Sequence, residues 1–276
     1  MRFLVIFMIF SLLGRAQGIY SARITDASTK TGIPFASIGV KGKNIGTVAD
    51  DKGNFELNLL KCPEDDTLKV SAIGYKTKAF TVTEARQGMS KIIYLEPQVV
   101  KLNEVVITSK KVKRRVLGTS KYSTRNCSAF QGLEGNWKGE EAAIRANNES
   151  GKSVFIEDFN FYIIQNKYED SLVFRLMLYA VNERNLPGAT FLTKPIIFKT
   201  AVKQGVVHVD LKNYNIVHEG DFFISLESLM DKMEQTKFCF AGSVKVPSYV
   251  KTSTFMNWYR VRGGGADLNV TVSYLK

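Results

Sequence analysis

The chain has 276 residues and a formal net charge of +12, with two histidines and three cysteines. Its hydrophobic content of 45% and aromatic content of 11% indicate a globular chain and exclude a disordered one. Three scattered cysteines are too few for a disulfide framework, and their odd number leaves at least one thiol free. We therefore expect stability to come from packing, while the pairing of Cys62, Cys127 and Cys239 stays open.

The amino terminus has the pattern of a signal peptide. Arg2 precedes an apolar run at residues 3–10 that is too short to span a bilayer. Ala16 and Gly18 then supply small residues at the −3 and −1 places of a cleavage site. We expect residues 1–18 to be removed and the mature chain, without a transmembrane segment, to be exported to the periplasm, the outer-membrane surface or the extracellular space. A retained transmembrane anchor is the alternative.

Positive charge is concentrated in one short segment. Residues 19–108 carry twelve basic and ten acidic residues, and residues 116–276 carry nineteen and sixteen. Between them, SKKVKRR at 109–115 holds five basic residues. Such a run is typical of a solvated linker, so we expect two domains with few contacts between them; an anion site is the alternative. Nucleic acid is not an expected partner, because the run lacks interleaved aromatics and the expected export would separate the chain from it.

The first of these segments has the pattern of short strands separated by turns. Apolar and polar residues alternate along it, and helical periodicity is absent. This pattern predicts a small antiparallel sandwich. The expected strands are 19–26, 34–41, 46–49, 54–59, 67–73, 78–83, 90–96 and 103–108.

A tight reversal is expected at DDKG, residues 50–53. Aspartates can accept hydrogen bonds from nearby amides, and Gly53 can adopt positive φ without steric cost. Phe55 and Leu57 would then share the core face of the returning strand. A calcium loop is the alternative, but it requires alternating oxygen ligands and a distant closing acid, which this segment lacks. We therefore expect no metal and no cofactor.

An ordered set of motifs extends across the same segment: GIPFASI, IGT, an aspartate followed by G-x-F-E-L, and VSAIGYK. In this order they resemble the carboxypeptidase-regulatory-like domain common in secreted and envelope proteins of Bacteroidota. The resemblance covers about residues 19–108 and implies a seven-stranded, transthyretin-like sandwich that is non-catalytic and serves in folding, spacing or docking. The matching positions include Asp26, Pro34, Ala36, Gly46, Thr47, Asp50, Gly53, Phe55, Ser71, Gly74 and Tyr75.

Residues 102–108, LNEVVIT, are similar to a segment that follows this domain in many TonB-dependent outer-membrane receptors, where the energising partner docks. A plug and barrel would follow in such a receptor, but about 160 residues remain, too few for a receptor barrel. We therefore interpret the segment as the last strand of the first domain, with partner docking as the alternative.

Residues 116–276 also have the pattern of strands separated by turns. This pattern predicts a second sandwich. The turn at Pro187-Gly188 and the pairing of VDL with a later FFISLE resemble jelly-roll and galactose-binding-like modules of secreted bacterial proteins. This resemblance specifies no ligand residue. The expected strands are 141–147, 154–165, 172–181, 194–200, 205–211, 221–227, 237–244, 255–261 and 268–275.

The sequence predicts no catalytic residues. His208 is expected on the solvent face of a strand and His218 in a turn, and neither has the neighbours of a zinc site or of a nucleophilic triad. Adjacent carboxylates occur at Glu140-Glu141 and at Glu157-Asp158. Neighbouring strand residues point to opposite faces, so neither pair can supply the acid and base of a glycosidase.

Aromatic side chains are the other candidates for a ligand site. Trp137, Trp258 and Tyr259 could stack on sugar rings. Alternation places Trp258 and Tyr259 on opposite faces of a strand, so one of them is expected in the core. Trp137 is expected in a loop, and the glycines at 263–265 in a hairpin.

We therefore expect an all-β protein of two sandwiches that acts as a non-enzymatic, exported envelope or cell-surface module. Its partner would be an envelope protein or a surface glycan, and the sequence identifies no binding residue. Two alternatives remain open. One is an accessory module or cryptic glycoside hydrolase, with carboxylates lining a groove of the second domain. The other is a receptor-like periplasmic signalling protein that uses residues 102–108.

Overall fold

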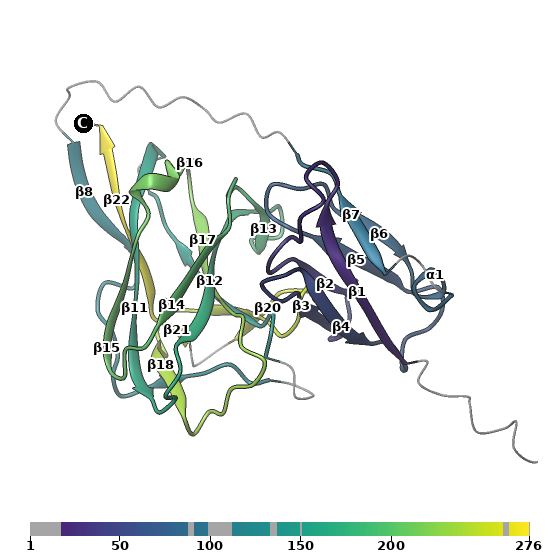
Figure 1. Cartoon of the computed structure of the whole chain (residues 1–276). Coiled ribbons are helices and arrows are strands. Elements are labelled where there is room, and N and C mark those ends of the chain that lie inside the picture. Colours follow the sequence, from purple (N-terminus) through teal and green to yellow (C-terminus); the bar gives the residue numbers. More distant parts are fainter. Residues whose placement is uncertain are drawn as a thin grey trace, which may run out of the picture.

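The computed structural model describes residues 18–87, 91–98, 112–132, 137–149, 151–261 and 265–275. They form two β bodies that lie side by side (Figure 1). We call residues 18–98 the first module and residues 112–275 the second module, since each encloses its own core cluster. The signal peptide predicted at 1–18, apart from Gly18, and the strand predicted at 103–108 lie outside the described residues.

The first module is a sandwich of two sheets, with the strand orders β4-β1-β7 and β3-β2-β5-β6. Alternating side chains from both sheets meet in a core that includes Ile24, Ile38 and Ile93. The predicted strands are confirmed here within a few residues at their ends. The elements are β1 (Ile19–Asp26), β2 (Ser37–Val40), β3 (Gly46–Val48), β4 (Asn54–Asn58), β5 (Thr67–Ser71), β6 (Lys78–Thr81), α1 (Val82–Arg86) and β7 (Ile92–Leu95).

The turn at 50–53 has the hydrogen bonds and the glycine conformation that were predicted, but it joins strands of two different sheets. Asp50 Oδ1 accepts hydrogen bonds from the backbone nitrogens of Lys52 and Asn54 at 2.9 and 2.7 Å, and Gly53 has a φ of 84°. However, β3 pairs with β2 and β4 pairs with β1, so the turn carries the chain from one sheet to the other rather than closing a hairpin. Local turn chemistry does not determine which strand receives the returning chain.

Two further details differ from the prediction. β1 pairs with β7 in parallel, where antiparallel pairing was expected. Residues 82–86 form α1 instead of extending the strand predicted at 78–83. The Thr81 hydroxyl accepts a hydrogen bond from the Glu84 backbone nitrogen at 3.1 Å, and the Glu84 carboxylate accepts one from the Thr81 backbone nitrogen at 2.6 Å. This capping box starts a helix although the apolar residues alternate.

The second module is a larger sandwich, with the strand orders β13-β12-β17-β10-β19-β20 and β21-β18-β11-β22-β8. β14 adds to β12, β15 and β16 add to β11, and β9 adds to β18. Phenylalanines such as Phe159, Phe161 and Phe174 fill the space between the sheets. The all-β fold is confirmed, whereas the jelly-roll assignment stays a prediction.

The strands of the second module have the following bounds. They are β8 (Val112–Gly118), β9 (Cys127–Ser128), β10 (Glu141–Ala146), β11 (Ser153–Asn166), β12 (Leu172–Val181), β13 (Pro187–Thr190), β14 (Ile196–Thr200), β15 (Gly205–Asp210), β16 (Val217–Glu219), β17 (Phe222–Ser228), β18 (Phe238–Ser243), β19 (Ser248–Lys251), β20 (Tyr259–Val261), β21 (Gly265–Ala266) and β22 (Leu268–Leu275). A 3-10 turn, Lys212–Tyr214, follows β15.

The linker predicted at 109–115 is too long. Residues 112–115 belong to β8, which pairs antiparallel with β22 at the edge of its sheet. An edge strand can carry several basic residues because their charged ends reach solvent. One of them, Arg114, forms an ion pair of 2.7 Å with Glu157. The second module therefore begins before residue 116.

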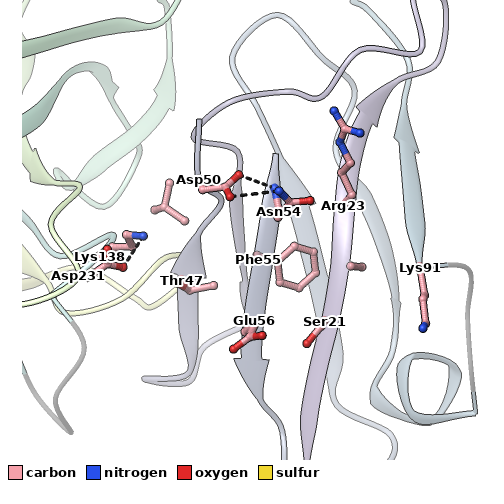
Figure 2. Close-up of a pocket in the computed structure, with 12 residues that line it drawn as sticks. Ser21, Arg23, Thr47, Asp50, Asn54, Phe55, Glu56, Lys91, Lys138 and Asp231 are labelled. Carbon is pink, nitrogen blue, oxygen red and sulfur yellow. Dashed lines mark hydrogen bonds and ion pairs between the residues drawn. The ribbon is translucent and has the colours of Figure 1, made fainter. Parts of the chain in front are cut away.

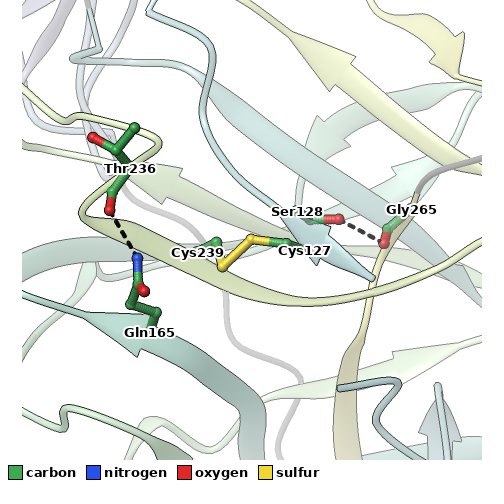
Figure 3. Close-up of a disulfide and its surroundings, with 6 residues drawn as sticks. All are labelled: Cys127, Ser128, Gln165, Thr236, Cys239 and Gly265. Atoms are coloured by element: carbon green, nitrogen blue, oxygen red, sulfur yellow. Dashed lines mark hydrogen bonds between the residues drawn. A yellow bond between two sulfur atoms is a disulfide. The ribbon is translucent and has the colours of Figure 1, made fainter. Parts of the chain in front are cut away.

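A disulfide joins Cys127 of β9 to Cys239 of β18 across 112 residues of sequence (Figure 3). Cys62 is a buried free thiol in the first module. The strand predicted at 255–261 is shorter than expected, because Phe255 has a φ of 60° and interrupts the extended backbone before β20.

Candidate binding groove between the modules

Four charged side chains form a row across the face of the second module that meets the first. Lys251, Glu141, Glu227 and Arg175 are successive register partners on β19, β10, β17 and β12. Directly opposed residues of antiparallel strands project from the same side, so the four groups are neighbours. Their side chains are 13%, 2%, 1% and 6% exposed, respectively. We call them the buried charge row.

Each charge in the row has a partner of opposite sign. Lys251 Nζ lies 2.5 Å from Glu141 Oε1, and Arg175 donates two hydrogen bonds to Glu227 at 2.6 and 2.7 Å. Glu141 also accepts hydrogen bonds from the hydroxyls of Tyr179 at 2.7 Å and Ser225 at 2.9 Å. Burial raises the pKa of Glu227; the Arg175 guanidinium opposes this shift and Glu141 adds to it, leaving the pKa above its ordinary value.

Arg175 also connects the two modules. Its Nη1 donates to the backbone oxygen of Phe35 at 2.6 Å, and its Nη2 donates to the Ser37 hydroxyl at 2.9 Å. Burial alone would lower the pKa of this guanidinium, but the charge and hydrogen bonds of Glu227 raise it above the usual arginine value. The side chain therefore remains charged while it holds main chain of the first module.

A second contact fits a threonine against two glycines. Gly39 and Gly46 are register partners on β2 and β3. A Cβ on Gly39 would lie 2.6 Å from Thr254 Oγ1, and a Cβ on Gly46 would lie 2.2 Å from the same atom. The Thr254 hydroxyl donates to the backbone oxygen of Ile38. The modules thus share a buried, close-packed interface, which corrects the expectation of few contacts between them.

Beside this interface lies a groove of about 550 Å³ (Figure 2). The first module contributes residues of β1, β3 and β4, and the second module contributes one ion pair. The lining residues are Ser21, Ala22, Arg23, Thr47, Val48, Asp50, Asn54, Phe55, Glu56, Lys91, Lys138 and Asp231.

The groove presents polar and apolar surface in similar amounts and carries both signs of charge. Lys138 Nζ lies 2.5 Å from Asp231 Oδ1, with the aspartate side chain 87% exposed. Across the groove, partial burial raises the pKa of Asp50, but hydrogen bonds from Asn54 and Lys52 and the charge of Lys138 outweigh it and leave the pKa below the usual aspartate value. The Lys138 charge thus acts across the boundary between the modules.

The carboxylates considered for catalysis lie apart from the groove. Glu141 belongs to the buried charge row, and Glu157 pairs with Arg114 at the sheet edge. Glu140 accepts hydrogen bonds from the backbone nitrogens of Gln131 and Gly132, and burial raises its pKa. Asp158 accepts a hydrogen bond from Asn160 at 2.7 Å.

The two histidines also lie apart. His208 is exposed on β15, as expected, with its Nδ1 2.8 Å from Asn160 Oδ1. His218 is on β16 rather than in a turn, and its ring stacks on Phe191 with centroids 4.1 Å apart. Burial lowers the pKa of His218. In the described ranges, no three metal-ligating side chains are grouped closely enough to hold an ion.

None of the three aromatic candidates lines the groove. Trp258 is half-buried, 5.7 Å from Tyr179 and under Lys251 Nζ at 5.1 Å. Its neighbour Tyr259 on β20 is 40% exposed, as expected for a side chain on the opposite face from Trp258. Trp137 lies outside helices and strands, as predicted, and packs against the core of the second module.

Sequence reasoning missed the groove as a site. Asp50 and Phe55 were recognised as turn and core residues, but their position opposite Lys138 and Asp231 depends on how the modules dock. No pattern in the sequence connects residues 47–56 with residues 138 and 231. The motif with the strongest signal, the turn at 50–53, does lie at the groove.

Comparisons with known proteins agree with the first module. Residues 20–107 match the family model of the CarboxypepD_reg-like domain, so this part of the chain is a carboxypeptidase-regulatory-like domain. No curated protein matches the chain. A solved structure of the T13 IBDV viral particle is similar at 10% identity with a TM-score of 0.27, covering 93% of this chain and 61% of that chain, which is too weak to support an argument. Within the described ranges, no helix has both the length and the apolar character needed to cross a bilayer.

Proposed function

We propose that this protein is a non-enzymatic docking protein of the cell envelope or cell surface, and that the groove between its modules binds the partner. The observation that carries the proposal is the shared lining: β3 and β4 come from the first module, and Lys138 and Asp231 come from the second. The buried charge row and the fit of Thr254 against Gly39 hold these two linings in one arrangement. A preformed groove binds without the entropic cost of assembling it.

The state of the acids favours binding over hydrolysis. A glycoside hydrolase needs one carboxylic acid with a raised pKa in the groove, facing a second carboxylate. In the groove Asp50 has a lowered pKa and accepts hydrogen bonds, so it is ionised at neutral pH and cannot donate a proton. Among the described residues, the carboxyls whose pKa is raised are Glu140, Glu227 and Asp267, and none of them lines the groove.

The lining also favours a protein partner over a glycan. Sugar sites usually present an exposed aromatic ring on which a sugar can stack. The aromatic ring in this groove is Phe55, which is 5% exposed and packs edge-on against Tyr20 at 5.5 Å. Protein interfaces combine an apolar centre with a polar rim that carries hydrogen bonds, and the groove has this arrangement around Val48 and Phe55. Export of the protein to this setting rests on the signal peptide predicted at 1–18.

The test is a binding screen of residues 19–276 against a glycan array and a random peptide display library, using a matched pair of charge reversals. Lys138→Asp places a second negative charge beside Asp231, whereas Lys199→Asp changes an exposed lysine of β14 outside the groove. We expect a ligand whose affinity falls at least tenfold with Lys138→Asp and stays within twofold with Lys199→Asp. Turnover of any glycan, or equal binding by both variants, would contradict the proposal.

A further inference from the structure

We propose that the groove binds an extended segment of a partner protein, which adds as a strand to the outer edge of β4 and places a basic side chain opposite Glu56. This inference rests on the proposed function, because it names the ligand class of the same groove. β4 lies at the end of the order β4-β1-β7, and β1 is its pairing partner within the described part of the chain. Among the described residues, no strand pairs with the opposite edge of β4.

The hydrogen-bond pattern shows which residues of β4 face that edge. The Leu59 backbone nitrogen donates to Gly18, and the Gly53 backbone oxygen accepts from Ile24. Both contacts show that the main-chain N–H and C=O groups of the odd-numbered residues from 53 to 59 face β1. Since the main-chain groups of successive strand residues point to opposite sides, those of Glu56 point away from β1. Glu56 lines the groove, so its N–H and C=O are presented there.

Asn54 supports this assignment and limits the length of the edge. Its backbone oxygen accepts from the Asp50 backbone nitrogen at 2.8 Å, and its backbone nitrogen donates to Asp50 Oδ1 at 2.7 Å. The main-chain groups of Asn54 are thus occupied by the 50–53 turn, which leaves Glu56 and Asn58 as the outward-facing residues of β4. A partner strand that pairs with both residues would span about five residues.

The edge of β4 lacks several of the features that usually prevent strand addition. Natural edges are protected by shortness, charged side chains, proline, bulges or a covering element; β4 is short and carries the single charge of Glu56. β4 reads NFELN, contains neither proline nor lysine, and keeps a regular register with β1 along its whole length. Next to it, the outer face of β3 is covered, because Thr254 and Gly139 of the second module lie against Gly46 and the Val48 side chain. The groove continues this established interface from the covered face of β3 to β4.

Charge favours a partner segment over a second copy of this chain. An antiparallel pair of two copies centred on Glu56 would oppose two carboxylates, and directly opposed like charges destabilise strand pairing. A lysine or arginine of a partner would instead face Glu56, with Asp231 on the far wall as a second acceptor. Its alternate side chains would reach the apolar floor at Val48 and Phe55, which are 2% and 5% exposed.

The experiment uses phage-displayed random twelve-residue peptides selected on residues 19–276. Selected peptides are synthesised with single N-methylated amides, since each methyl removes one donor and blocks pairing on one side of the strand. We expect enrichment of basic residues flanked by alternating apolar residues. We also expect affinity to fall about tenfold for methylation at alternate positions and to change less than twofold at the positions between them. Glu56→Pro should abolish binding, whereas Glu56→Gln keeps the N–H and should retain binding with reduced selectivity for basic peptides.

Other outcomes separate this inference from the proposed function. Equal sensitivity of all amides, or full binding by folded Glu56→Pro protein, would overturn strand addition, and the N-methyl series decides the matter even if that variant does not fold. A glycan ligand that is lost with Lys138→Asp would overturn strand addition but keep the groove as the binding site. A dimer of the chain that disappears with Glu56→Pro would identify a second copy as the occupant and overturn the inference. Absence of any ligand sensitive to Lys138→Asp would overturn both proposals.

Discussion

Two ion pairs at the boundary between the modules each join a basic side chain to a carboxylate, but they differ in how far solvent reaches them. Arg175 and Glu227 have side chains that are 6% and 1% exposed, whereas Lys138 and Asp231 are 17% and 87% exposed. The buried pair cannot lose one partner without leaving a charge in the interior, so it fixes the docking of the modules. The open pair is screened by solvent and can exchange water for a ligand at little cost. The buried pair thus holds the two modules together, and the exposed pair beside it remains accessible to a ligand.

The largest effect is expected from breaking the buried pair. Arg175→Ala leaves the Glu227 carboxylate buried beside Glu141, so the free energy of unfolding should fall by about 3–5 kcal/mol in denaturant titrations. Arg175→Met combined with Glu227→Leu removes both charges and should recover most of that loss. Asp231→Ala, which opens the exposed pair, should change stability by less than about 1 kcal/mol. Similar losses for Arg175→Ala and Asp231→Ala would contradict the distinction.

A smaller loss is expected from crowding the threonine contact. A Cβ on Gly46 would meet Thr254 Oγ1 at 2.2 Å and Ser253 Oγ at 2.5 Å. Gly46→Ala should therefore lower the free energy of unfolding by about 1–3 kcal/mol, as overpacking usually does. In a protein that also carries Ser253→Ala and Thr254→Ala, the same substitution should lower it clearly less. A mutant cycle that compares the unfolding free energies of these variants measures the difference. Equal cost in both backgrounds would mean that the strain lies within the first module.

A loss of similar or smaller size is expected from the turn that starts β4. Gly53 has a φ of 84°, and a Cβ there would lie 2.5 Å from the backbone oxygen of Ile24. Gly53→Ala should destabilise the first module by about 1–3 kcal/mol through backbone strain and contact. Lys52→Ala, at the exposed neighbouring position, is the control and should leave the melting temperature unchanged. An unchanged melting curve for Gly53→Ala would show that the turn tolerates a side chain.

The smallest effects concern pH and have opposite signs in the two modules. The pKa of Asp50 is lowered, so its contribution to stability is present above the unfolded pKa and is lost as pH falls through the folded pKa. Asp50→Asn should therefore be destabilising at pH 7, and this loss of stability should shrink as the pH falls below the unfolded pKa of an aspartate. Burial raises the pKa of Asp267 more than the hydrogen bond from the Ser123 backbone nitrogen lowers it, so its contribution is lost as pH rises through the folded pKa.

Asp267→Asn should accordingly gain stability relative to the parent chain as pH rises from 4 to 7. Unfolding free energies of both variants at several pH values check this contrast. Curves that shift in the same direction for both aspartates would contradict the assigned environments.

Much of the fold could be predicted from local pattern, while the site could not. Alternation identified β1 and β4, and turn chemistry identified Asp50 and Gly53, because these signals act within a few residues. The helix α1 was missed because a capping box at Thr81 outweighed strand-like alternation. The Cys127–Cys239 bridge and the buried charge row depend on residues far apart in sequence that meet only when sheets form. The groove requires a further step, the docking of two modules.

The central claim is that one ligand touches both modules in the groove. Amide hydrogen exchange of residues 19–276, measured with and without the selected peptide, tests it most directly. We predict slower exchange both in β4 around Glu56 and in the second module around Lys138 and Asp231, with both changes absent in Lys138→Asp protein. Protection confined to a single module, or protection that persists in that variant, would contradict a binding site shared between them.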